Sequence, residues 1–324
     1  TLIFKGEQYR DYNGITTRYE GRNITFASNA RIIVDANVDG VILRGSGSTI
    51  DNMIIDTTLV IETYTSSAFK VEAIGSYDEC VEANLINNLK VIQPFSYYKG
   101  TAIELVTGGD SYIYRNKFTN IDISGHYYGI KFSNDSYNGI NANMFSGSIW
   151  ASRQAMNIDG GGNIFNFNIQ NTLIDTENPE MANIYCNGDH NQFLGFSYDI
   201  GGEGLVKYAY EFGERGFNNT VIAYYPKQLI KGAELNRNFI QRIGSPEDVQ
   251  LVMENLPNGR PFQDFRYEGG TLMPSKDFRM ISGLSNSLGR AHEIIDSIDV
   301  VTENVTLSGL GYNMGSDTMR LVEM

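Results

Sequence analysis

Residues that build redox and metal sites are scarce in this 324-residue chain, which has two cysteines, three histidines and one tryptophan. No two histidines have a metal-ligand spacing such as His-x-x-x-His. Cys80 and Cys186 lie far apart in the sequence, each beside apolar neighbours, so we expect two buried thiols without a disulfide. The sequence therefore predicts neither a metal site nor a cofactor.

Basic clusters and long apolar runs are also missing. The formal net charge is −13, and no Lys/Arg-rich segment offsets it, so we expect no binding to nucleic acid. No run approaches the roughly 18 apolar residues that a membrane-spanning helix needs, so we expect no membrane insertion. The opening segment TLIFKGEQYR does not have the form of a signal peptide, and a start at Thr1 suggests a fragment of a longer protein.

Strand and corner residues are abundant instead. The chain contains 34 glycines, 20 tyrosines and 17 phenylalanines, with many asparagines, while charged residues make up only 19%. Aromatic and β-branched residues favour strands, and Gly and Asn favour tight corners. The composition predicts an all-β protein.

A unit of strand, Gly/Asn/Asp corner and strand recurs along the middle of the chain. Its leading apolar residues are separated by 27, 26, 28 and 26 residues, a regularity typical of stacked repeats. These leading residues are Ile103, Ile130, Met156, Ile184 and Tyr210. Weaker copies occur around Val41, around Phe69 and over 228–243.

Stacking the units predicts two inward apolar columns and a column of asparagines. The first apolar column holds the pairs Ile103/Leu105, Ile130/Phe132, Met156/Ile158, Ile184/Cys186 and Tyr210/Phe212. The second holds Ile113, Ile140, Phe165, Phe193 and Val221. The predicted asparagine ladder consists of Asn116, Asn143 and Asn168.

These patterns predict a right-handed, single-stranded parallel β-helix over residues 1–243. The triple glycine at 160–162 is then a corner between two strands, since the following NIFNFNI has strand periodicity and not the helix that a phosphate-binding loop requires. Residues 244–324 are expected to form a small C-terminal cap or module, with strands and a short helix over 245–257.

The coil pattern resembles the pectin-lyase-like superfamily, and the run GRNITFASNARIIVDANVDGVILRGSGSTIDNMII is similar to the entry coils of bacteriophage tailspike and appendage proteins. The resemblance covers roughly residues 20–243 and carries no catalytic signature. Only SGHYYG at 124–129 has a faint similarity to a pectin-hydrolase motif, and no aspartate cluster matches a calcium-dependent pectate lyase. It implies a homotrimer in a virion tail or appendage that binds, and often cleaves, bacterial surface polysaccharide.

Residues that alternate with the first apolar column form an outward row suited to sugars, because it mixes charge, amide and aromatic groups. The predicted binding residues in this row are Glu104, Lys131, Asn157 and Tyr185, followed by Glu211. Loops that precede these strands add His126, Tyr127, Tyr128, Trp150 and Arg153. Packing of the His-Tyr-Tyr loop on its neighbour, and of Trp150 in a core or trimer interface, are the structural alternatives.

Glycoside hydrolysis requires two carboxyl groups, about 5–5.5 Å apart for retention and about 6.5–9.5 Å apart for inversion. The candidate catalytic pairs are Asp159 with Glu211 and Asp159 with Asp189. Neither pair is specific, and the structural alternative for each carboxylate is a solvated charge that keeps the protein soluble. A lyase would instead use the group of His126, Tyr127, Tyr128 and Arg153. We favour a polysaccharide depolymerase acting as a glycoside hydrolase, with a lyase or a non-catalytic adhesin or structural virion protein as alternatives.

Overall fold

A computed structural model shows an all-β protein whose strands are mostly parallel. The chain divides into two compact units, Thr1–Asn236 and Arg237–Met324. The structure describes residues 1–5, 7–10, 16–60, 62–76, 79–94, 98–134, 139–170, 172–197, 204–224, 230–231, 238–242, 251–253, 264–268, 271–274, 293–299, 304–309 and 318–320.

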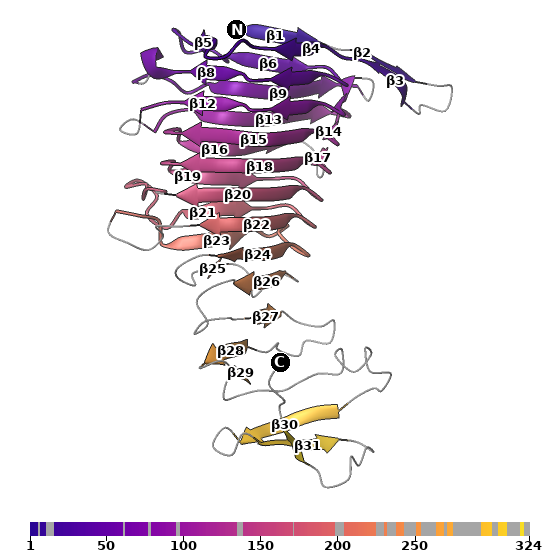
Figure 1. The fold of residues 1–324 in the computed structure, drawn as a ribbon, viewed down its shortest axis with the longest axis vertical. Coiled ribbons are helices and arrows are strands. Elements are labelled where there is room, and N and C mark those ends of the chain that lie inside the picture. The colour runs from indigo at the N-terminus through magenta and orange to yellow at the C-terminus, as the bar shows by residue number, and fades with distance from the viewer. Residues whose placement is uncertain are drawn as a thin grey trace. The chain divides into compact units, whose positions relative to one another are not determined.

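In the first unit, each turn of the chain adds one strand to a nine-stranded parallel sheet, here called the first sheet (Figure 1). Strands of successive turns lie side by side along it, and every pairing is parallel. The strands are β1 (Leu2–Lys5), β6 (Val41–Arg44), β9 (Ser67–Gly75), β13 (Thr101–Gly109), β16 (Tyr128–Asn134), β19 (Gln154–Ile158), β21 (Ala182–Cys186), β23 (Tyr208–Phe212) and β25 (Ile230–Lys231).

The same turns add strands to a second parallel sheet. Its main path in this unit contains β4 (Asn23–Thr25), β7 (Thr49–Asp51), β11 (Leu85–Asn87), β15 (Lys117–Ser124), β18 (Met144–Trp150), β20 (Ile164–Gln170), β22 (Gln192–Ser197) and β24 (Thr220–Tyr224). Beside it lie β5 (Arg31–Ile33), β8 (Ile54–Asp56) and β12 (Lys90–Ile92). A short third sheet contains β10 (Val81–Glu82), β14 (Ile113–Tyr114) and β17 (Ile140–Asn141). This arrangement is compatible with a β-helical solenoid.

The remaining elements are few. A 3-10 turn, η1, spans Thr58–Val60, and β2 (Glu7–Arg10) pairs antiparallel with β3 (Thr16–Glu20). The second unit contains an antiparallel set of β26 (Phe239–Arg242), β27 (Leu251–Met253), β28 (Asp264–Glu268) and β29 (Thr271–Pro274). A second antiparallel set contains β30 (Glu293–Asp299), β31 (Asn304–Gly309) and β32 (Thr318–Arg320).

The helix predicted over 245–257 is wrong for Leu251–Met253, which form β27. Apolar residues at short intervals suit a strand as well as a helix, and here Leu251 and Val252 pair with Phe265 and Asp264 of β28. The rest of the predicted helix lies outside the described residues.

Strand register confirms the first apolar column. Ile103 pairs with Ile130, Ile130 with Met156, Met156 with Ile184 and Ile184 with Tyr210, and all are buried. The weaker copies extend the same column, because Val41 pairs with Phe69 and Phe69 with Ile103. The period of about 27 residues therefore corresponds to one turn of the chain.

The second predicted column is wrong at its centre. Ile113 and Ile140 pair in the third sheet, whereas Phe165 pairs with Phe145 in the second sheet. The phenylalanine rings there form a continuous stack with centroid distances of 4.6, 5.2 and 5.1 Å. Its members are Phe118, Phe145, Phe165 and Phe193, with Val221 next in register.

A buried asparagine ladder follows the corner that leads into the second sheet. Each side-chain amide donates to the Oδ1 of the next asparagine at 2.8–3.1 Å, and the backbone N–H of the same residue donates to that oxygen as well. The ladder contains Asn84, Asn116, Asn143, Asn163 and Asn191, and Asn219 accepts from the backbone of Asn191. The predicted ladder positions of Asn116 and Asn143 are thus confirmed. The prediction for Asn168 is wrong, because this residue is exposed on β20.

The triple glycine explains why the predicted second column and the predicted asparagine ladder are both misaligned after Asn143. Asn143 and Asn163 are only 20 residues apart, compared with 27 and 28 for the ladder steps on either side. Gly162 has φ of 65°, and a Cβ on Gly160 would lie 2.4 Å from the carbonyl oxygen of Ile140. The glycines therefore form a corner, as predicted, and allow one shortened turn that a fixed repeat length does not anticipate.

We expect Asn143→Ala to lower the free energy of unfolding by on the order of 3 kcal/mol, because two buried donors of Asn116 lose their acceptor. Urea unfolding followed by circular dichroism measures the change. Asn168→Ala, at the exposed position, is the matched control and should change stability by less than about 0.5 kcal/mol. Equal effects of the two substitutions would contradict the ladder.

Candidate functional site

The outer face of the first sheet carries the predicted row of polar side chains in register. Glu104 pairs with Lys131, Lys131 with Asn157, Asn157 with Tyr185 and Tyr185 with Glu211. All five are half-buried, whereas the residues that alternate with them are buried. The structure therefore brings these residues together on one face, and their roles in binding remain predictions.

Glu104 is held in place by groups from neighbouring strands. Its carboxylate accepts hydrogen bonds from the hydroxyls of Ser67 at 2.5 Å and Ser133 at 2.7 Å. Lys131 Nζ lies 3.6 Å from the same carboxylate and 5.4 Å from the centre of the Tyr128 ring. Glu104 is thus a fixed anionic acceptor with a balancing cation beside it.

Asp159 follows β19 and is paired with an arginine two turns later. Arg215 Nη2 donates to both carboxylate oxygens, at 2.9 and 2.7 Å. The pKa of Asp159 is nevertheless raised, because burial disfavours its charged form more than Arg215 and Asn187 favour it. A carboxyl group with a raised pKa is the kind of group that acts as a general acid.

Tyr185 lies within the field of both candidate carboxylates. Its phenol pKa is raised, first by burial and then by the charges of Glu211 and Asp159. Gly213 makes room for it, since a Cβ there would lie 2.6 Å from the Tyr185 hydroxyl. Asn157, next in the row, donates to Gln154 Oε1 at 2.9 Å. Asp159, Tyr185 and Glu211 therefore form one group on this face.

Asp189 occupies a corner position rather than the outer row. It is buried, and its carboxylate lies 3.1 Å from Nδ1 of the exposed His190. His190 has φ of 54° and directly precedes Asn191 of the ladder. Asp159 and Asp189 both act on the Cys186 thiol, whose pKa burial raises to about 12. Both carboxylates are therefore close enough to Cys186 to affect the pKa of its thiol.

His126 is fully buried, which separates it from the surface that a glycan can reach. Its Nε2 lies 3.3 Å from the Thr57 hydroxyl, its Nδ1 lies 3.0 Å from the Ser124 carbonyl, and its ring packs edge-on against Tyr64. Burial lowers the pKa of the imidazole to about 4. We therefore remove His126 from the candidate site.

Tyr127, Tyr128 and Arg153 pack against their neighbours in the loops before the first sheet. The Tyr127 hydroxyl donates to Asp175, and burial together with this bond raises the Tyr127 pKa above its usual range. Its ring meets the Tyr128 ring at 4.7 Å, while Arg153 covers the Tyr98 ring at 4.6 Å and donates to the carbonyl of Ile174. A phenol that retains its proton is poorly suited to the base of a lyase.

Trp150 lies on a different surface from the row. It ends β18 of the second sheet, in register with Ser124 and Gln170, and 45% of its surface is exposed. Its exposure leaves it accessible for stacking on a sugar ring.

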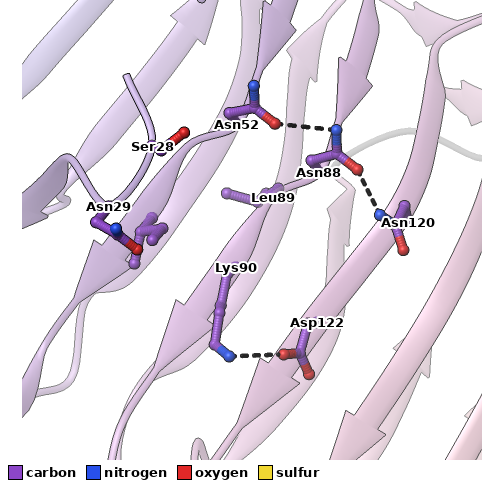
Figure 2. Close-up of a pocket in the computed structure, with 9 residues that line it drawn as sticks. Ser28, Asn29, Asn52, Asn88, Leu89, Lys90, Asn120 and Asp122 are labelled. Atoms are coloured by element: carbon purple, nitrogen blue, oxygen red, sulfur yellow. Dashed lines mark hydrogen bonds and ion pairs between the residues drawn. The ribbon is translucent and has the colours of Figure 1, made fainter. Parts of the chain in front are cut away.

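The sequence prediction missed a pocket of about 370 Å³ on the outer side of the second sheet (Figure 2). It is lined mainly by amides from successive turns, with one ion pair and two apolar side chains. The lining residues are Ser28, Asn29, Asn52, Ile54, Asn88, Leu89, Lys90, Asn120 and Asp122. The sequence held a usable signal, because Asn52, Asn88 and Asn120 each precede an apolar residue at intervals of 36 and 32 residues.

Cys80 and Cys186 are buried free thiols, as predicted. Within the described part of the chain, no group of three or more His, Cys, Asp or Glu side chains could hold a metal ion. No helix among the described residues has the length and hydropathy that crossing a membrane requires.

Comparison with known proteins adds little to this geometry. No protein-family model matches the sequence. No curated protein matches it either. Among solved structures, the chain is similar to ORF18 of Geobacillus virus E2, with 14% identity and a TM-score of 0.36, over 93% of this chain and 67% of that one.

We expect His126 to titrate near pH 4, well below the usual value of about 6.5. Because the folded state binds the proton more weakly than the unfolded state, His126 costs stability as the pH falls from about 6.5 towards 4. The NMR shifts of its ring protons give the midpoint, assigned by their loss in His126→Gln. A midpoint near 6.5 would contradict the burial.

Proposed function

We propose that this chain is a right-handed, pectin-lyase-like β-helix that binds and cleaves a bacterial surface polysaccharide by glycoside hydrolysis. The observation that carries the proposal is the group of Asp159, Tyr185 and Glu211 on one sheet face, in which burial raises the pKa of Asp159. The resemblance of the coils to tailspike and appendage proteins supports a homotrimer in a virion tail as its setting.

The spacing of the two carboxyls favours inversion. Tyr185 lies between the strands of Asn157 and Glu211, so these strands are about 9.6 Å apart at roughly 4.8 Å per strand. Asp159 lies two residues beyond Asn157, just after the end of β19, which widens the backbone separation further. A separation of this size exceeds the roughly 5–5.5 Å of retaining enzymes and favours the roughly 6.5–9.5 Å of inverting ones, which leaves room for a water molecule.

In this mechanism, Asp159 protonates the glycosidic oxygen as the bond to the anomeric carbon breaks. Glu211 takes a proton from the water that attacks the opposite face of the sugar. Glu104, Lys131 and Asn157 hydrogen-bond to neighbouring sugar units along the row, and Tyr185 supplies an aromatic surface for stacking. Asp189, in the corner before Asn191, takes no part in these proton transfers.

A non-catalytic glycan-binding protein is the second candidate, and it is favoured by the Asp159–Arg215 pair, in which one guanidinium nitrogen donates to both carboxylate oxygens. An ion pair of this geometry stabilises the carboxylate as an anion, which opposes proton donation. The lyase alternative is weaker, because His126 is buried and the Tyr127 phenol has a raised pKa.

We expect Asp159→Asn and Glu211→Gln each to reduce glycan cleavage about 10²- to 10⁴-fold, because each removes one proton-transfer group. The assay incubates the protein with purified bacterial capsular and cell-wall polysaccharides and measures reducing ends together with absorbance of unsaturated uronates. Asp35→Asn, at an exposed loop carboxylate, is the control and should leave cleavage unchanged.

The two readouts separate the candidates. Reducing ends without absorbance indicate a hydrolase, both together indicate a lyase, and the absence of both leaves the non-catalytic protein. Full activity in both site variants would show that these carboxylates are not the catalytic pair.

The proposed trimer has its own test. Sedimentation equilibrium at neutral pH should give three times the chain mass of 36.2 kDa. A monomer mass at micromolar concentration would contradict the trimer while leaving the proposed carboxylate pair intact, since both carboxylates come from one chain.

A further inference from the structure

The pocket on the second sheet is built from residues of successive turns, on a different sheet from the Asp159 group (Figure 2). Asn52 lies between β7 and β8, Asn88 between β11 and β12, and Asn120 within β15. All three have φ between 54° and 60°, so the chain bends at the same place in each turn and places the three amides in a row.

These amides are joined by hydrogen bonds but keep capacity for a ligand. Asn88 Nδ2 donates to Asn52 Oδ1 at 3.0 Å and to Asp51 Oδ1 at 2.9 Å, and Asn120 Nδ2 donates to Asn88 Oδ1. An amide has two N–H donors and an acceptor oxygen, so the bonds within this row use only one N–H of Asn120 and only the oxygen of Asn52. A sugar hydroxyl both donates and accepts hydrogen bonds, so a row that presents donors and acceptors side by side is suited to it.

The charges in the pocket balance. Lys90 Nζ lies 3.1 Å from Asp122 Oδ2, and both side chains are 49% exposed. The half-buried Ile54 adds apolar surface, on which the C–H face of a sugar ring can pack. With a net charge of −13 on the whole chain, a balanced pocket favours a neutral ligand over a polyanion.

The pocket continues into a row of side chains along the same face. Lys90, Asp122, Ser148, Asn168 and Phe196 follow one another in register across five neighbouring strands. Ser148 donates to Asp122 at 3.1 Å, and Phe196 is 48% exposed at the far end. Four strand spacings give a length of about 19 Å, which suits a short oligosaccharide lying across the strands.

We propose that this pocket and row bind a neutral glycan of hexose or N-acetylhexosamine units, as a site separate from the Asp159 group. Such a site would hold the polysaccharide at a second point, so that dissociation from the first sheet does not release the chain. The proposal does not depend on cleavage, because the pocket binds sugar whether or not the first sheet is catalytic.

The structural alternative is that these asparagines serve only the fold. Asparagine tolerates positive φ, and stacked amides stabilise one another, so both features would occur without a ligand. The test must therefore remove the side chains without disturbing the bends. Glycine does this, because it adopts positive φ without strain.

The experiment uses saturation-transfer NMR with glucose, galactose, mannose, rhamnose, N-acetylglucosamine and N-acetylgalactosamine, and with glucuronate and galacturonate as acidic probes. We expect at least one neutral sugar to bind and its Kd to rise about tenfold or more in Asn88→Gly/Asn120→Gly. Asn218→Gly is the matched control, since Asn218 also has positive φ, at 55°, but lies outside the pocket. It should bind as the wild type does.

Several results would overturn the proposal: no neutral sugar binds, uronates bind more tightly, or the double variant binds as the wild type does. A signal that survives the double variant but disappears in Asp159→Asn/Glu211→Gln would place sugar binding on the first sheet alone. If the double variant does not fold by circular dichroism, Asn120→Gly replaces it, because it keeps the Asn52–Asn88 bond.

Discussion

The interior of each turn becomes dry, and its buried amides become hydrogen-bonded, only when the next turn covers it. Burying a phenylalanine contributes roughly 1.5–3 kcal/mol, and leaving a buried amide without a partner costs about 1–3 kcal/mol. These magnitudes are similar, but hydrophobic burial does not select a particular partner, whereas a hydrogen bond requires a donor and an acceptor in the right places. The stack of Phe118, Phe145, Phe165 and Phe193 drives association of the turns, while the asparagine ladder fixes which residue lies above which.

Apolar periodicity was enough to predict the all-β class and the register of the first sheet, because one inward residue recurs there at nearly constant spacing. It failed between Ile140 and Phe165, which lie in different sheets. Both point inward, and the apolar pattern alone does not show to which sheet an inward residue belongs. The buried asparagines carry the missing information, since each amide of the ladder bonds to the equivalent amide of the next turn. Had they been aligned first, the 20-residue step would have identified the shortened turn.

For the candidate site too, the sequence predicted the positions of residues along the strands but not their side-chain contacts. Backbone register placed Glu104, Lys131, Asn157, Tyr185 and Glu211 in one row, and this follows from alternation along strands. The partners of the side chains in the candidate site could not be predicted from strand alternation. Arg215 lies 56 residues from Asp159, and Asp175 lies 48 residues from Tyr127, so each pair depends on loop paths between turns. His126 was a candidate for the binding surface because it lies in a loop that precedes a strand of the first sheet, yet it fills the space between Thr57 and Tyr64.

Outward positions are free of the constraint that governs the interior, and this freedom allows one scaffold to carry two different surfaces. On the first sheet, half-buried carboxylates are set against Lys131 and Arg215, an arrangement in which proton affinity can be tuned. On the second sheet, amides and one exposed ion pair present hydrogen bonds without net charge. A change at either surface leaves the ladder and the phenylalanine stack intact. Function can therefore vary from face to face while the interior maintains the fold, so fold alone does not decide which glycan is bound or whether it is cut.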